Sequence, residues 1–235
     1  MDDSHSASGR GSNPPADSGN PLSVPAPHHP LRITRTHLPP DTLLHRIHNE
    51  KYHACQFNPG LHGNARFSPV SDSTGSPIPS LYGGLTPACA MMETIFHDIP
   101  CAPGFKTLDK NKLCGLVLSA LTVTRELMLA DLSSIALRKL GVSRRQLIET
   151  EKCDYPSTRL WAQAIHRQCA DIQGLSWISR QDDSARAVIL FGDRISAGIL
   201  QPAGGSRPLL TDPAIFSEIL NLADKLDVLL IPGAG

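Results

Sequence analysis

A turn, a short strand and a well-marked helix follow one another between residues 63 and 98, and this succession constrains what the chain can fold into. The strand is expected over residues 80–83. Thr86 then offers a capping hydroxyl and Pro87 takes the first helical position, which is how helices often begin. The helix should run to about Asp98, because Pro100 cannot continue it. The first expected unit of the fold is therefore a strand that leads directly into a capped helix.

This helix carries a carboxylate in otherwise apolar surroundings. Lone buried carboxylates are costly, so they are rare without a partner or a task. Arg66 and Tyr82, a short distance upstream of Glu93, could supply both. Taken singly, each residue has an ordinary alternative: Glu93 could reach solvent from the core edge, Arg66 could be a surface residue, and Tyr82 could be a half-buried packing residue. The apolar neighbours of Glu93 are Ala90, Met91, Met92, Ile95 and Phe96.

The other expected elements mix strands and helices without a regular βαβ rhythm, which favours an α+β fold with a mixed, mostly antiparallel sheet and flanking helices. Arg46 lies inside an expected strand, where an inward guanidinium would need an anionic partner. Leu160, Ala164 and Ile165 should share one face of the longest helix. The expected strands are 42–47, 113–124, 125–131, 177–178, 187–191 and 229–231, and the further helices are 134–140, 143–148, 156–172 and 212–226.

Composition narrows the class of protein. The chain of 235 residues has a formal net charge of zero and no basic stripe, which argues against direct nucleic-acid binding. Its longest apolar run, residues 113–123, is too short to cross a membrane. The first 37 residues are rich in Ser, Gly, Pro and Asn and are expected to be disordered, with a single domain over 38–235. The six cysteines form no CxxC pair and are expected to be reduced core residues of a cytoplasmic protein.

Familiar chemical motifs are missing from the sequence. There is no GxGxxG after a strand, no GxxxxGK[ST], no HExxH and no GxSxG. His28 and His29 are adjacent, and His45, His48 and His53 are close in sequence, but no cysteine or carboxylate completes a metal site at a suitable spacing. No metal site is therefore expected.

Several short motifs occur in an order that resembles the RES domain family. The resemblance covers residues 41–195 and includes an LMLADLSS stretch. The family often has Gly before its second Arg, where this chain has Ala65, and the insert at residues 68–80 is long. The motifs are LLHRI with Arg46, NARFSP with Arg66, SLYGG with Tyr82, CAMMETIFHD with Glu93, GLSWISRQ with Ser179 after Trp177, and the closing strand AVILFGD.

This resemblance implies an ADP-ribosyltransferase-like fold and an enzyme that cleaves the nicotinamide–ribose bond of NAD. Glu93, Arg66 and Tyr82 would be catalytic, with Glu93 stabilising positive charge on the ribose and Tyr82 stacking on the nicotinamide ring. Arg46 and Arg66 would bind the phosphates of the substrate, and Tyr82 would bind the substrate through its ring. Ser179 would hydrogen-bond substrate or phosphate, without acting as a covalent nucleophile.

The resemblance also implies a biological setting. NAD would be a substrate and not a cofactor, with water or inorganic phosphate as the acceptor, and NAD loss would arrest growth. A helix-turn-helix antitoxin of the Xre type would be the protein partner, while self-association is left open. Two alternatives stay open as well: a mono-ADP-ribosyltransferase that modifies a macromolecule, and a non-catalytic NAD-binding module.

Overall fold

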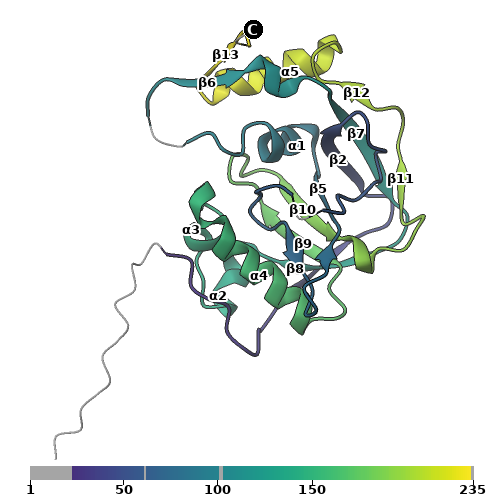
Figure 1. Cartoon of the computed structure of the whole chain (residues 1–235), viewed down its shortest axis with the longest axis vertical. Helices are drawn as coiled ribbons and strands as arrows, with labels where there is room; N and C mark the ends of the chain where they lie inside the picture. The colour runs from purple at the N-terminus through teal and green to yellow at the C-terminus, as the bar shows by residue number, and fades with distance from the viewer. Residues whose placement is uncertain (1–22, 61, 101–102, 234–235) are drawn as a thin grey trace, which may run out of the picture.

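A nine-stranded mixed sheet runs through the centre of the chain (Figure 1). The computed structural model describes residues 23–60, 62–100 and 103–233. Neighbouring strands are antiparallel except for β8 and β9, which are parallel, so the expected α+β class with a mostly antiparallel sheet is confirmed. The order across the sheet is β1 (Arg35–Leu38), β8 (Leu127–Asp131), β9 (Gly174–Ile178), β10 (Arg186–Phe191), β5 (Ser80–Gly84), β2 (Leu43–Asn49), β7 (Leu116–Val123) and β11 (Leu200–Pro202), with β12 (Arg207–Pro208) also on β7.

The sheet is strongly curved. Leu38 in β1 and Leu200 in β11 belong to the two ends of the strand order, yet both are buried in one apolar cluster. A flat sheet of this width would hold its outer strands far apart, because neighbouring strands lie about 4.8 Å from each other. The cluster is filled by strand side chains, including Leu44, Leu121 and Leu190. Curvature therefore lets one face of the sheet pack largely against itself.

The helices form two groups on either side of the sheet's central strands (Figure 1). One group packs Met91 and Phe96 against Ile215 and Ile219 in a common core. The other group packs Trp161 and other large side chains against β8, β9 and β10. The first group is α1 (Pro87–Thr94) and α5 (Pro213–Lys225), beside a small parallel sheet of β6 (Lys106–Asp109) and β13 (Val228–Ile231); the second is α2 (Ser134–Lys139), α3 (Arg144–Leu147) and α4 (Tyr155–Gln168).

Helix α1 begins as the sequence predicts and ends earlier. The Thr86 hydroxyl accepts a hydrogen bond from Cys89 N at 3.0 Å, and Pro87 opens the helix. The last helical residue is Thr94, not Asp98. His97 Nδ1 lies 3.0 Å from Thr94 O, the carbonyl that Asp98 N would need to continue the helix. A side chain thus takes the place of the next backbone hydrogen bond.

Strands β2 and β5 separate soon after they meet. Their pairing is limited to His45 and Gly84, whereas β2 pairs with β7 over seven consecutive residues. Past this pair, the part of β2 that carries Arg46 and the part of β5 that carries Tyr82 face each other across a cavity. The opening in the sheet is what makes room for a site.

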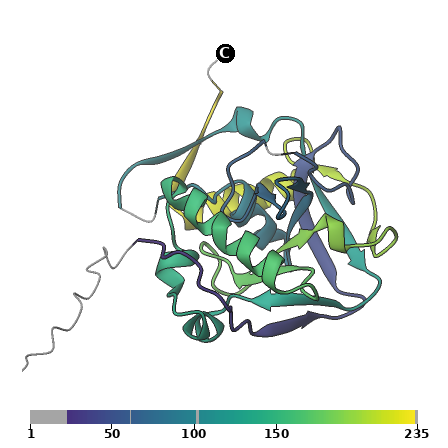
Figure 2. The same ribbon diagram turned by 60° about the horizontal axis from the view of Figure 1, so that its bottom comes forward.

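The N-terminal boundary predicted at residue 37 is wrong for the part of the tail that the structure describes. From Ser23 onward the chain runs along α4 and then joins the sheet as β1 (Figure 2). We call residues 23–38 the N-terminal strap. Trp161 Nε1 donates to Pro25 O at 2.8 Å, and Leu31 N donates to Gln168 Oε1 at 2.8 Å. Val24, Leu31 and Ile33 of the strap pack on the core beside α4, and Leu38 is buried under the sheet. The polar residues around them hid these contacts from an analysis of composition; residues 1–22 lie outside the described part.

Other expectations have mixed outcomes. The long helix buries Trp161 and Ile165, but Leu160 is 48 % exposed. The buried face of the helix is therefore rotated by part of a turn from the predicted one. Cys89 and Cys169 are buried as expected and Cys55 is partly buried, whereas Cys114, which ends one short 3-10 helix, and Cys153, which lies in another, are exposed; Cys101 lies outside the described residues. The insert at 68–80 forms a hairpin of β3 (Val70–Ser71) and β4 (Pro77–Ile78). Within the described residues, no helix combines the length and apolar character needed to cross a membrane.

Candidate active site

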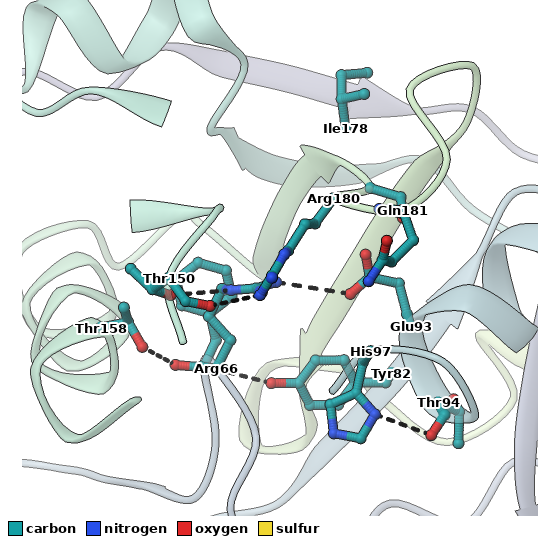
Figure 3. A network of polar contacts seen from close by, with 12 residues as sticks. Arg66, Tyr82, Glu93, Thr94, His97, Thr150, Thr158, Ile178, Arg180 and Gln181 are labelled. Carbon is teal, nitrogen blue, oxygen red and sulfur yellow. Dashed lines mark hydrogen bonds and ion pairs between the residues drawn. The ribbon is translucent and has the colours of Figure 1, made fainter. Parts of the chain in front are cut away.

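Four of the predicted site residues line one cavity of about 260 Å³. Arg46 comes from β2, Arg66 from the loop before β3, Tyr82 from β5 and Glu93 from α1. Figure 3 shows the last three with their side chains directed toward a common space. Residues that are 47 positions apart in sequence thus meet where β2 and β5 separate.

Glu93 and Arg66 form a loose, buried ion pair. Arg66 Nη1 lies 3.9 Å from Glu93 Oε2, and the two side chains are 5 % and 10 % exposed. This separation is longer than a hydrogen bond. Among the described residues, none donates a hydrogen bond to the Glu93 carboxylate. A carboxylate in this position keeps most of its acceptor capacity for a ligand, although the nearby guanidinium reduces the cost of burying its charge.

Arg66 is held by the segment that links α3 to α4 and by the first turns of α4. Its Nε lies 3.5 Å from Thr150 Oγ1, and its guanidinium carbon lies 5.5 Å from the centre of the Tyr155 ring. The Thr158 hydroxyl donates to the backbone carbonyl of Arg66. Arg180 in turn donates from Nη1 to Thr150 O at 2.9 Å (Figure 3). The guanidinium of Arg66 is therefore fixed through its own contacts and through a second arginine.

Tyr82 is anchored at both its hydroxyl and its ring. The hydroxyl accepts a hydrogen bond from Phe67 N at 3.0 Å, and the ring meets Trp177 edge-to-face at 6.1 Å between centroids. Burial raises the pKa of Tyr82 to about 12. The phenol therefore stays protonated near neutral pH, and Tyr82 can bind or position a ligand but is a poor general base there.

Arg46 is a buried cation without a carboxylate partner among the described residues. Its Nη1 donates to Ala54 O at 2.7 Å and to Gln56 O at 2.8 Å, while its Nε is buried with no acceptor within the described part of the chain. Burial lowers the pKa of Arg46 to about 10, so it is still charged at neutral pH. A buried guanidinium with a spare donor favours an anionic ligand.

Ser179 does not join the other four residues. Its side chain is fully buried and does not line the cavity. Its hydroxyl accepts a hydrogen bond from Gln181 N at 3.3 Å, and Gln181 donates to Ile99 O at 2.9 Å. Direct contact between Ser179 and a ligand is therefore not supported by this geometry. The serine instead shapes the loop that carries Arg180 and Gln181 past α1.

Several residues that line the cavity were not foreseen from the sequence. His97 and Thr94 follow Glu93 by four residues and one residue, and Tyr155 begins α4. The helical spacing of Glu93 and His97 could have pointed to a shared face. Tyr155 carried no such signal, because it approaches through the tertiary fold. Among the residues that the structure describes, no three His, Cys, Asp or Glu side chains are grouped as a metal site would need.

Comparison with known families agrees with the motifs. The model of the RES domain matches residues 43–212, which includes all five predicted site residues and extends beyond residue 195 to include β11 and β12. A search of curated proteins found no match. Because the family model covers well over half of the chain, and because its motifs converge on one cavity with the exception of Ser179, the protein belongs to the RES domain family.

Proposed function

We propose that this protein cleaves the bond between nicotinamide and ribose in NAD. The observation that carries the proposal is the Glu93 carboxylate, which lacks hydrogen-bond donors among the described residues and shares a cavity with Arg66, Tyr82 and Arg46. Membership of the RES family supports the same chemistry. The cavity combines an acid group, an aromatic ring and two guanidinium groups, and these match the ribose, the pyridinium and the phosphates of NAD in turn.

The reaction breaks the C–N bond between the anomeric ribose carbon and the pyridinium nitrogen. The bonding electrons leave with nicotinamide, which becomes neutral, and positive charge grows on the ribose. A fixed carboxylate beside the sugar stabilises that charge more in the transition state than in the ground state. Glu93 is already in place on α1, so little reorganisation is needed at the moment of reaction. Arg66, 3.9 Å away, offsets part of the cost of burying the carboxylate's charge.

The remaining groups bind the substrate. The positively charged pyridinium ring is attracted to an aromatic face, and Tyr82 presents its ring to the cavity. Arg46 and Arg66 offer planar pairs of donors that suit phosphate oxygens. With water as acceptor, a new C–O bond gives ADP-ribose and a proton; with inorganic phosphate, it gives the 1-phosphate ester of ADP-ribose.

The test is NAD turnover by the purified full-length chain, with products identified in buffers that contain or lack phosphate. We expect release of nicotinamide, and Glu93→Gln should lower kcat by about 100-fold or more. Glu126→Gln is the matched control, because Glu126 is 58 % exposed and pairs with His37 away from the cavity. Wild-type protein that releases no nicotinamide in either buffer would overturn the proposal.

Other outcomes would identify the alternatives. Label from NAD that ends on a protein, with little free ADP-ribose, would show a mono-ADP-ribosyltransferase. Calorimetric binding of NAD without turnover would show a binding module. In cells, expression should lower NAD and arrest growth in a manner that Glu93→Gln abolishes. Relief of that arrest by a co-expressed helix-turn-helix protein would identify the proposed Xre-type antitoxin partner.

A further inference from the structure

A second cavity, of about 490 Å³, lies directly beside the first. The two cavities share Arg46, Ile47, Asn58 and His62 as lining residues. The second is otherwise formed by the end of β2 and the loop that follows it, over residues 48–60. The second volume lies within the range of small-molecule pockets and the first lies slightly below it, and the shared lining residues place the two cavities side by side.

Arg46 stands at the junction of the two cavities. Within the described part of the chain, its buried Nε has no acceptor, and no carboxylate oxygen lies within 4.0 Å of its guanidinium nitrogens. Its two donated hydrogen bonds go to neutral carbonyls in the loop that walls the second cavity. A buried cation held in this way is completed by an anion at the junction. A ligand that occupies both cavities should therefore carry its negative charge in the middle.

The lining of the second cavity suits a purine. Tyr52 and Phe57 provide aromatic surfaces, and no Asp or Glu is among the lining residues. Asn49, Gln56 and Asn58 each use the amide oxygen to accept a backbone hydrogen bond from within three residues, at 3.1, 3.3 and 3.1 Å. Their amide nitrogens have no acceptor in the described part of the chain. Amide donors complement the ring nitrogens of adenine, which are acceptors.

We infer that the second cavity binds the adenosine half of a dinucleotide, with the pyrophosphate on Arg46 at the junction. This inference rests on the proposed function for the nicotinamide half, which the first cavity would hold. The adenine ring stacks on Tyr52 or Phe57 and takes hydrogen bonds from the side-chain amides. The same cavity would bind ADP or AMP alone, which gives a test that does not depend on NAD cleavage.

The experiment is calorimetric titration of the full-length chain with ADP and, separately, with nicotinamide mononucleotide. Tyr52→Ala removes an aromatic face at a residue that is 46 % exposed. Gly60→Trp adds bulk at the cavity wall, where a Cβ would meet only ordinary contacts of 3.7 Å or more. We expect each variant to weaken ADP binding by about tenfold and to weaken nicotinamide mononucleotide much less. Phe105→Ala is the matched aromatic control, because Phe105 is 83 % exposed and lines neither cavity.

The outcomes separate the two ideas. If ADP does not bind, or binds both variants as tightly as wild type, the adenosine site is overturned even when NAD is cleaved. Equal losses for ADP and nicotinamide mononucleotide would also overturn it, since they would indicate a general disturbance. If NAD is not cleaved but ADP binding shows the expected pattern, the proposed reaction fails and the adenosine site stands. Melting temperatures of the variants show whether they are folded.

Discussion

Arg46 lowers the stability of the folded state because its charge is buried, and the same buried charge is available to bind an anionic ligand. Burial lowers its pKa from 12.5 to about 10, so holding the charge costs the folded state on the order of 3 kcal/mol below pH 10. The folded chain binds fewer protons than the unfolded chain between pH 10 and 12.5. The free energy of unfolding therefore rises as pH increases from 10 to 12.5, because the buried guanidinium then loses its charge in the folded state.

We accordingly expect Arg46→Met to lower the free energy of unfolding at pH 7 by less than about 1 kcal/mol, or to raise it, although the residue is buried. ADP at 100 times its Kd should stabilise wild type by about 2.7 kcal/mol and the variant by far less at the same concentration. Urea unfolding with and without ADP measures both. A variant that is strongly destabilised yet keeps the full gain from ADP would contradict the role of Arg46 as an anion site.

Tyr82 gives a second prediction at this scale. Tyr82→Phe keeps the ring but leaves the buried Phe67 N–H without its acceptor, which should cost about 1–3 kcal/mol of stability. Because the pKa of the phenol is about 12, it does not ionise between pH 6 and 9. The dependence of kcat/KM on pH over that range should therefore have the same shape in both proteins. Loss of one limb of the profile in Tyr82→Phe would show that the phenol titrates during turnover.

At the same scale, four residues chosen from short motifs line one cavity, whereas Ser179 does not, and His97 and Tyr155 were not foreseen. Arg46, Arg66, Tyr82 and Glu93 are costly or bulky in their surroundings, so their positions in short motifs were informative. A serine fits almost anywhere, and Ser179 follows a buried strand into a loop that turns its hydroxyl inward. Only packing decides such an orientation, and packing is not visible in a motif.

Between elements, the contact that positions Glu93 is the close approach of α1 to β5. A Cβ at Gly84 would lie 2.7 Å from Ala90 N and 2.8 Å from Cys89 Cβ. Both are parts of α1, and the helix backbone cannot yield as a flexible side chain would. Because Gly84 has no side chain, α1 can lie close to β5, and this places the Glu93 carboxylate at the cavity.

We expect Gly84→Ala to push α1 away from β5, to lower the free energy of unfolding by about 1–3 kcal/mol, and to reduce NAD turnover as Glu93 moves. Gly205→Ala is the matched control, because a Cβ there meets nothing within 4 Å. Urea unfolding and kcat of the two variants make the comparison. Equal stability and equal turnover in both would mean that α1 accommodates the methyl group without moving.

Element types were predicted well because their local signals agree with their tertiary setting. The start of α1 at Thr86 and Pro87 and the strands β2, β5, β8 and β10 lie close to where pattern and capping residues put them. The early end of α1 depends on the His97 side chain, and the separation of β2 from β5 depends on which strands pair. Neither the end of α1 nor the separation of β2 from β5 is marked by a local sequence pattern, yet the separation of the strands makes room for the cavity.

At the scale of the whole molecule, the folded domain includes the N-terminal strap, residues 23–38. β1 pairs with β8 over four residues and so covers an edge of the main sheet. The strap also supplies Pro25 O, the acceptor for the buried indole of Trp161 in the middle of α4. Composition marked this segment as a tail because its few apolar residues stand among polar ones and its contacts with distant elements are not visible in composition.

A chain shortened to begin at residue 39 should therefore be much less stable than one shortened to begin at Ser23. The shorter form loses the β1–β8 pairing, exposes the edge of β8 and leaves the Trp161 N–H without its acceptor, each of which costs about 1 kcal/mol or more. The longer form keeps all of these contacts and is the matched control. Urea unfolding gives the difference, and hydrogen exchange should show faster exchange in β8 and α4 of the shorter form. If the two forms unfold at the same urea concentration, the strap is a surface attachment and the domain begins near residue 39, where composition placed it.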